Sequence, residues 1–214
     1  MLTKVHVNEI KKIQERIEAR KEHQYAAPTY KDVDDLKSIR KIIVDNFLAD
    51  EDGLMIAYYT FAYLGECYAM MGRRAQSAKD RSKAVQLAAE LKNVYGKDVE
   101  RIEEVYNYAI FDRNYYVKDI CLDLRDFGTQ LFEDGLGMYL NANKKHPTLK
   151  NDPVEMTEEY LSVIDEVERL IDENITYRGM GSCFEYWDLK TKYLAERGVN
   201  WTAPNILNPG VHFD

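Results

Sequence analysis

The stretch LMIAYYTFAYLGECYAMM, residues 54–71, decides the fold of this 214-residue chain. Apolar or aromatic side chains occupy most of its positions, so they cannot all lie on one face of a helix. The stretch contains no proline, and Gly72 follows it as a stop. Because a helix that is apolar nearly all round must be enclosed by its neighbours, the sequence predicts a central helix over residues 54–71.

Further helices are predicted on both sides of this one from apolar residues three and four positions apart. The expected ranges are 8–23, a second helix after Thr29 with Leu36, Ile39, Ile43 and Phe47 as its core face, 74–95, 153–176 and 183–197. Residues 98–143 are also helix-like, with a kink or break expected near Gly128, Gly135 and Gly137. No segment alternates as a strand would, so we expect an all-α fold. Its antiparallel helical hairpins should pack as a short bundle or array in one domain, residues 1–214.

Several helix starts are predicted from capping residues. Thr29 with Asp32 and Ser182 with Glu185 have capping-box spacing, Asp98 is a candidate N-cap, and Asp152 precedes a proline. Two prolines prevent a regular helix in the C-terminal tail, residues 199–214. We therefore expect an extended tail whose large apolar residues, such as Trp201 and Ile206, pack against the fold.

Composition excludes several functional classes. The chain is 45% hydrophobic and 31% charged, which is typical of a folded soluble protein. A net charge of −8 argues against nucleic acid as the main partner. The N-terminus lacks the apolar core of a signal peptide, and no apolar run reaches the roughly 18 residues that span a bilayer. We expect a cytoplasmic protein without a membrane partner.

The central stretch and the residues after it resemble one repeat of the tetratricopeptide family. Four residues have the spacing of that family's first helix, namely Phe61, Leu64, Gly65 and Tyr68. Gly72 falls at the turn, and Ala84 falls at a close-packing position on the second helix. The resemblance covers about residues 58–91 and implies a helical hairpin over 58–95 that packs with similar pairs to form a binding groove.

Other positions depart from the family pattern. Arg81 stands in place of an aromatic residue and Ala89 in place of the closing proline. One period of about 34 residues to either side, Lys31 and Val99 occupy the position of the motif's glycine, so no second copy is recognised. A helical hairpin unrelated to the family fits the same residues and remains an alternative.

No catalytic or metal-binding constellation is found. A di-iron helical bundle needs a glutamate three residues before a histidine, and none of the four histidines has one. The three cysteines, Cys67, Cys121 and Cys183, are far apart, and two of them lie in apolar-rich segments. We expect no catalytic residue, no metal and no cofactor.

The 16 tyrosines supply the best candidates for binding, since tyrosine combines an apolar ring with a polar tip. If a groove exists, the predicted lining residues are Tyr59, Tyr63, Arg74 and Tyr106. The favoured hypothesis is a non-enzymatic interaction module that holds a peptide or protein partner. The alternative is a small-molecule sensor or small enzyme with an aromatic pocket, in which Glu104 and Tyr108 could do acid–base work.

Two further surfaces could bind partners. Residues 152–173 hold nine acidic residues and one basic residue, Arg169, which form either a solvated face or a docking strip for a basic partner. The aromatic tail could contact a second copy of the chain and give a homodimer.

Overall fold

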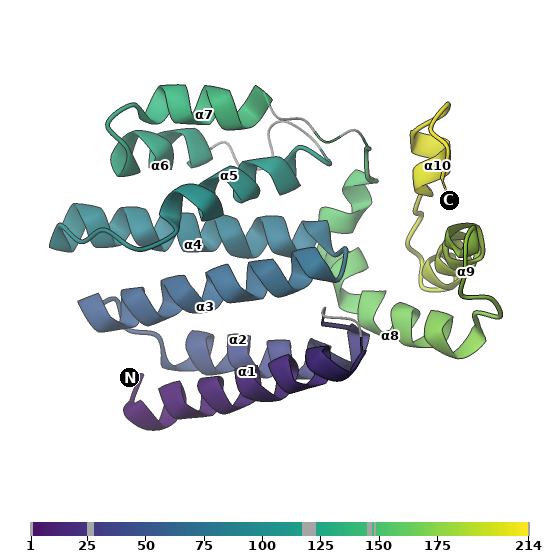
Figure 1. The fold of residues 1–214 in the computed structure, drawn as a ribbon, viewed down its shortest axis with the longest axis horizontal. Helices are drawn as coiled ribbons and strands as arrows, with labels where there is room; N and C mark the ends of the chain where they lie inside the picture. The colour runs from purple at the N-terminus through teal and green to yellow at the C-terminus, as the bar shows by residue number, and fades with distance from the viewer. Residues whose placement is uncertain (1, 25–27, 117–122, 145–146, 148, 214) are drawn as a thin grey trace. The chain divides into compact units, whose positions relative to one another are not determined.

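The computed structural model describes residues 2–24, 28–116, 123–144, 147 and 149–213. Its helices are α1 (Lys4–Gln24), α2 (Val33–Asn46), α3 (Glu51–Met70), α4 (Arg74–Tyr95), α5 (Ile102–Arg113), α6 (Asp123–Leu131), α7 (Gly135–Lys144), α8 (Glu158–Asn174), α9 (Ser182–Ala195) and α10 (Pro204–Leu207), with short 3₁₀ helices η1 (Tyr30–Asp32) and η2 (Pro153–Met156) (Figure 1). The described residues contain no strand, and the predicted all-α fold class is confirmed.

The contacts divide the chain into two compact units, whereas the sequence analysis expected a single domain. Unit 1 contains residues 1–114 and 118–146, and unit 2 contains residues 115–117 and 147–214. Each unit has its own hydrophobic cluster, so two separate cores form. The amino-acid sequence does not reveal this division. Residues 115–117 belong to unit 2 but lie within the stretch 98–143, which has a helix-like pattern throughout.

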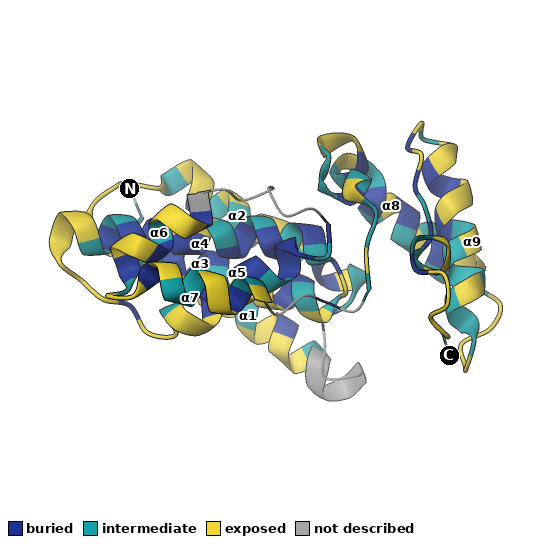
Figure 2. Ribbon diagram, turned by 90° about the horizontal axis from the view of Figure 1, so that it is seen from above, coloured by how far each residue is buried: buried dark blue, intermediate teal, exposed yellow. Residues whose placement is uncertain are grey.

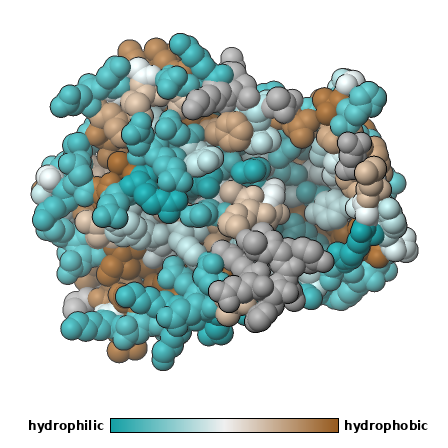
Figure 3. All heavy atoms as spheres, viewed as in Figure 1, coloured by the Kyte–Doolittle hydropathy of each residue, from teal (hydrophilic) through white to brown (hydrophobic). Residues whose placement is uncertain are grey.

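In unit 1, helices that follow each other in sequence lie side by side, from α1 to α7 (Figure 1). The buried segments concentrate on α3 and α4, in the middle of this arrangement (Figure 2). On the face drawn in Figure 3, hydrophobic side chains form separate patches among hydrophilic ones. This succession of neighbouring helices corresponds to the predicted series of helical pairs.

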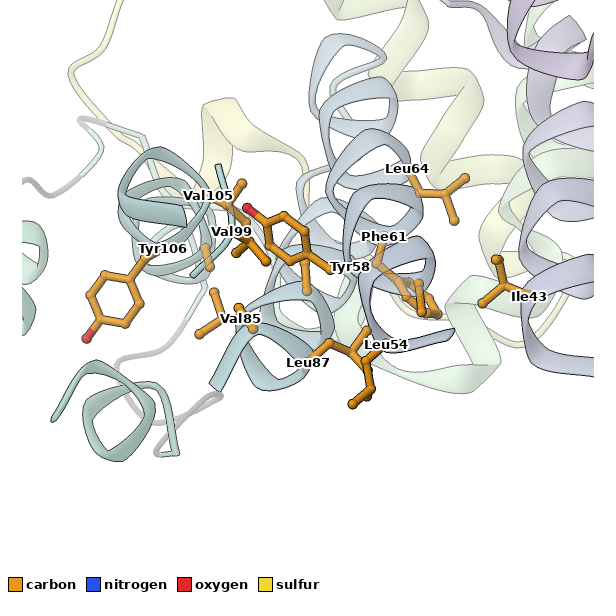
Figure 4. Packing of buried hydrophobic residues seen from close by; sticks show 14 of the residues in the cluster. Ile43, Leu54, Tyr58, Phe61, Leu64, Val85, Leu87, Val99, Val105 and Tyr106 are labelled. Carbon is orange, nitrogen blue, oxygen red and sulfur yellow. The ribbon is translucent and has the colours of Figure 1, made fainter. Parts of the chain in front are cut away.

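Helix α3 is central to unit 1, as predicted. Leu54, Phe61 and Leu64 point into the core, where Figure 4 shows them with residues of neighbouring helices. The burial is not complete, however, because Tyr59 and Met70 are each 43% exposed. Part of the α3 surface is thus open to solvent.

Helix α4 has the bounds that the sequence predicts. Its alanines, including Ala78, Ala84 and Ala88, are buried and allow neighbouring helices to approach closely. Gly96 ends the helix in the left-handed conformation with φ 65°, which glycine adopts without a steric cost.

The helical region after α4 is divided into α5, α6 and α7. A break was predicted near its glycines, and α6 does end shortly after Gly128 while α7 begins at Gly135. The two helices touch at these residues, since a Cβ on Gly135 would lie 2.2 Å from the Gly128 carbonyl oxygen. Asp98 was predicted to cap the helix that follows it, but this prediction is wrong. Arg101 occupies the N-cap position of α5, because the chain turns there with φ 60°. Cys121 lies outside the described residues.

The N-terminal helices pack largely as the apolar pattern indicates, but Phe47, which was predicted on the core face of the second helix, follows α2 and is 38% exposed. Ile10, Ile13 and Ile17 of α1 are buried, and Arg20 forms ion pairs with Asp32 and Asp35. The predicted capping box of Thr29 and Asp32 is present and starts η1, which leads into α2.

Unit 2 is built from α8 and α9 around its own core. Ile164, Val167 and Ile171 of α8 pack with Leu194 of α9 and with Trp201 beyond it. The helix predicted over residues 153–176 is present but divided: Asp152 caps the 3₁₀ helix η2, and Thr157 caps α8, which ends at Asn174.

Ser182 is not the N-cap of α9, which corrects the predicted capping box. Gly181 takes that position with φ 81°, and Ser182 is already helical. The Glu185 carboxylate instead accepts hydrogen bonds from the backbone N–H groups of Thr176 and Tyr177 and so closes the preceding loop.

The C-terminal tail follows the prediction only in part. Trp201 is buried as expected, but Ile206 is 67% exposed, and residues 204–207 form the short helix α10. Asn208 anchors this segment, since its side chain exchanges hydrogen bonds with the backbone of Lys150. Among the described residues, no helix is both long and apolar enough to cross a membrane.

Candidate functional site

A groove with a volume of about 410 Å³ runs along unit 1 between α3 and α5, over part of α4. Its aromatic and apolar lining comprises Tyr58, Tyr59, Ala62, Tyr63, Ala69, Met70, Val105 and Tyr108. Its charged lining comprises Glu66, Arg74, Arg81, Glu100, Arg101 and Glu104. The volume lies within the range of about 300–1,000 Å³ that is typical of ligand-binding sites, whereas the lining is unusually rich in charged groups.

Helical spacing explains why these side chains meet. Tyr59, Tyr63, Glu66 and Met70 recur at intervals of three and four on α3, so they form one stripe along the helix. Helix α5 presents a similar stripe that includes Tyr108. Three residues of the stripe on α3, Tyr59, Glu66 and Met70, are exposed, whereas Tyr63 is half-buried and contacts Glu18 of α1.

Gly65 allows α4 to pack directly against α3 beneath the groove. A Cβ at this position would lie 2.6 Å from Arg81 Cγ and 3.4 Å from the Ser77 carbonyl oxygen. The aliphatic part of Arg81 therefore packs directly against the α3 backbone at Gly65. Its guanidinium lies 4.7 Å from the ring centroid of Tyr108 in a cation–π contact.

A buried carboxylate fixes the arginines at one end of the groove. Asp112, which is fully buried, accepts hydrogen bonds from Arg74 Nη1 at 3.1 Å and Arg81 Nη1 at 2.6 Å. The Ser77 hydroxyl lies 2.6 Å from the same carboxylate and 2.8 Å from the Gly65 carbonyl oxygen. Since a buried carboxylate needs such partners, the cluster holds both arginines in defined positions.

At the other end of the groove, Arg101 is held by a bidentate contact with Glu104. Its Nε and Nη2 donate to the two carboxylate oxygens at 2.9 Å each, and Nη2 lies 3.6 Å from Glu66. The hydrogen bond from Arg101 lowers the pKa of Glu104. Tyr58 fastens the same turn to α3, because its hydroxyl donates to the Glu100 carbonyl oxygen at 2.7 Å.

The structure brings together three of the four predicted site residues. Tyr59, Tyr63 and Arg74 line the groove. Tyr63 is half-buried, and burial, together with Cys67 and the Glu18 carboxylate, raises the pKa of its hydroxyl. This hydroxyl donates to Glu18 at 3.4 Å and remains protonated at neutral pH.

Tyr106 does not line the groove, which corrects the prediction. It is fully buried and points away from Tyr58, and its hydroxyl donates to the Leu124 carbonyl oxygen at 3.0 Å (Figure 4). The physical reason is helical geometry: residues 104, 105 and 108 of α5 reach the groove, whereas residue 106 lies on the face toward α6.

Sequence reasoning did not include Arg81, Arg101 and Glu66 in the groove. It did name Glu104 and Tyr108, but for the alternative acid–base hypothesis. Arg101, Glu104 and Tyr108 are three and four positions apart, and this spacing could have predicted that they share one helical face. The pairing of that face with the exposed stripe of α3 could only be seen in three dimensions.

A second groove, of about 830 Å³, lies on the other side of α5. Its lining comprises Val99, Arg101, Ile102, Glu103, Glu104, Asn107, Tyr108, Phe111 and Ala142. Three residues, Arg101, Glu104 and Tyr108, line both grooves, so they form the crest between them.

Unit 2 contains a buried charged cluster that the sequence analysis did not identify. Glu155 accepts hydrogen bonds from Lys190 at 3.2 Å, from Trp201 Nε1 at 2.8 Å and from the Tyr116 hydroxyl at 2.9 Å. The Lys190 ammonium also lies 4.4 Å from the Trp201 ring centroid. Burial opposes the charge of Lys190, but Glu155, together with Tyr186 and Glu168, more than offsets it and raises the pKa of the ammonium. This cluster joins four segments of unit 2 and is structural in character.

Within the ranges that the structure describes, no three histidine, cysteine or acidic side chains lie close enough together to bind a metal ion. No protein-family model, curated protein or solved structure matches this chain. The geometry of the groove is therefore the basis for a functional hypothesis.

Proposed function

We propose that this protein is a non-enzymatic, cytoplasmic interaction module that binds a peptide segment of a protein partner in the groove between α3 and α5. The observation that carries the proposal is the exposed aromatic lining: Tyr59 is 43% and Tyr108 46% exposed in a concave surface. Tyrosine rings are enriched at protein interfaces because they bury a large area at a low entropic cost.

The arrangement of helices supports a tetratricopeptide-like role for the α3–α4 hairpin. Helices α3 and α5 supply the groove's two walls, and α4 lies between them in sequence and packs against both. Arg74 and Arg81 reach the groove from α4. In this proposal the hairpin and α5 act together as one and a half structural repeats.

A small enzyme or sensor is less well supported. The buried Asp112 carboxylate is occupied by ion pairs with two arginines. Arg101 lowers the pKa of Glu104, so Glu104 is poorly suited to accept a proton near neutral pH. The groove is also open along its aromatic rim, whereas a catalytic pocket needs to exclude water.

The proposal is tested by affinity capture from an extract of the source cells. The full-length chain, Tyr59→Ala, Tyr108→Ala and the control Tyr177→Ala serve as baits. Tyr177 is 56% exposed in unit 2, so its replacement makes a matched change outside the groove. We expect both groove variants to lose a partner that the wild-type chain and Tyr177→Ala retain. Equal retention by all four baits would contradict the proposal.

A further inference from the structure

The two ends of the unit 1 groove differ in charge. At one end Glu66, Glu100 and Glu104 lie with Arg101, which leaves a formal charge of −2, and the nearby charge of Arg81 also helps to lower the pKa of Glu104. Glu18, which contacts Tyr63, adds another carboxylate beside this region. We name this part, defined by Glu66, Glu100, Arg101 and Glu104, the acidic end.

The opposite end has two arginines, Arg74 and Arg81, over the buried Asp112, which leaves a formal charge of +1. Little of this positive charge reaches the surface, because the Arg81 side chain is 8% exposed and the Arg74 side chain 30% exposed. The side chains of Glu66 and Glu104, by contrast, are each 48% exposed. The exposed charge of the groove is therefore concentrated at the acidic end, where Glu66 and Glu104 contact the Arg101 side chain, which is itself 60% exposed.

Aromatic rings line the same groove and can bind a cation. Tyrosine faces attract lysine and arginine within about 6 Å of the ring centroid. The groove already contains one such contact, between Arg81 and Tyr108. Tyr59 and Tyr63 lie on the α3 wall, on the same helical stripe as Glu66.

We propose that the partner segment held in this groove carries a lysine or arginine whose charged group binds among Glu66, Glu100 and Glu104, against the tyrosine rings of the α3 wall. This inference rests on the proposed function and specifies its partner as a basic peptide. Charge complementarity carries it: an acidic segment would meet half-exposed carboxylates at close range, which disfavours binding.

The test begins with selection of random twelve-residue peptides, displayed on phage, against the immobilised full-length chain at 0.15 M NaCl. Enriched peptides are synthesised with a fluorescent label and titrated by fluorescence polarisation. We expect a lysine or arginine to recur at one position, and its replacement by glutamine to weaken binding.

Three variants identify the site of binding. Tyr59→Ala removes part of the aromatic wall. Glu66→Gln/Glu100→Gln removes two carboxylates and leaves the Glu100 carbonyl, which Tyr58 uses, in place. The matched control, Glu9→Gln/Glu133→Gln, removes the same charge from exposed positions of unit 1 that do not line the groove.

We expect Glu66→Gln/Glu100→Gln to raise the Kd of the selected peptides about three- to tenfold, the range for two exposed ion pairs. The control double variant should change the Kd less than twofold. Raising the salt concentration to 0.5 M should weaken wild-type binding and reduce the difference between the variants.

The unfavourable outcomes are distinguishable. Peptides that depend on Tyr59 but lack a recurring basic residue, or that bind Glu66→Gln/Glu100→Gln as tightly as the wild-type chain, overturn this inference and leave the proposed function intact. If no selected peptide depends on Tyr59, both proposals fail. Equal weakening by the control double variant shows that the net charge of the chain attracts the peptides, and it overturns the inference.

Discussion

Unit 1 and unit 2 each contain a buried carboxylate, and the two are stabilised in different ways. Asp112 in unit 1 is bound by two arginines that extend to a groove at the surface. Glu155 in unit 2 is bound by Lys190, Trp201 and Tyr116, and all four side chains are buried.

The difference shows that two buried carboxylates can have different structural roles. The Asp112 cluster connects the core to a surface and fixes the charged groups at one end of the groove. The Glu155 cluster does not extend to a surface groove. Its hydrogen bonds connect the C-terminal segment around Trp201 with η2 and α9. We therefore expect substitutions at Glu155 to affect stability alone, and substitutions at Asp112 to affect both stability and the groove.

The largest effect is expected from Glu155→Ala. It leaves the Lys190 ammonium buried without a carboxylate, which costs about 3–5 kcal/mol of unfolding free energy. Both tryptophans of the chain, Trp187 and Trp201, belong to unit 2, so tryptophan fluorescence during urea unfolding reports on this unit specifically.

The double variant Glu155→Ala/Lys190→Met is the control. It removes both charges and should recover a large part of the lost stability. A single variant within about 0.5 kcal/mol of the wild-type chain would show that the pair does not matter. A double variant no more stable than the single one would show that the uncompensated charge is not the cause.

Asp112→Asn is expected to cost less, about 2–3 kcal/mol, because Arg74 is partly exposed and can be hydrated when its partner is lost. Unfolding is followed by far-UV circular dichroism, since unit 1 contains no tryptophan. Asp126→Asn, at an exposed residue of α6, should be close to neutral. Equal effects of the two substitutions would contradict the role given to Asp112.

Gly65→Ala tests the close packing beneath the groove. Helix propensity favours alanine by up to about 1 kcal/mol, but the new Cβ would clash with Arg81 Cγ at 2.6 Å. We expect overpacking to prevail, with a net loss of about 1–3 kcal/mol by chemical denaturation. A variant more stable than the wild-type chain would mean that α3 and α4 are not in direct contact at this point.

The smallest effect is expected on stability at alkaline pH. It distinguishes the Glu155 cluster, whose cation is a lysine, from the Asp112 cluster, whose cations are arginines. The pKa of Lys190 is raised in the folded protein, so its contribution to stability is complete below the unfolded value of about 10.4 and is lost as the pH rises through the folded value. Arginine stays protonated throughout this range, so the Asp112 cluster should not respond. Tryptophan fluorescence should detect a loss of stability above pH 10 that Lys190→Arg reduces. The same loss in both proteins would exclude Lys190 as its source.

Local patterns were sufficient to predict most of the fold. The apolar residues of α3, the isoleucines of α1 and the glycine after α4 each specify a helix or its end through short-range geometry, and the structure confirms them. Predictions were wrong where two local signals compete: Gly181 takes the N-cap position before Ser182, and Arg101 takes it instead of Asp98. Caps depend on backbone conformation in the preceding loop, which the residue type alone does not determine.

The candidate site was partly predictable. Tyr59, Tyr63 and Arg74 could be chosen as exposed or polar members of the central hairpin, whereas Tyr106 could not be told apart from Tyr108 without the orientation of α5. The pairs that organise the site join residues more than 30 positions apart, such as Arg81 with Asp112 and Arg101 with Glu66. The Glu155 cluster spans a similar separation, so no local pattern could reveal it.

The central claim, that the groove between α3 and α5 binds a partner, is tested most directly by site-specific photo-crosslinking in the source-cell extract. A benzophenone amino acid replaces Tyr59, Tyr108 or, as the control, Tyr177, and crosslinked peptides are identified by mass spectrometry. The account predicts that the same partner segment is attached at both groove positions and not at Tyr177. Crosslinks absent from both groove positions, or equally abundant at Tyr177, would contradict it.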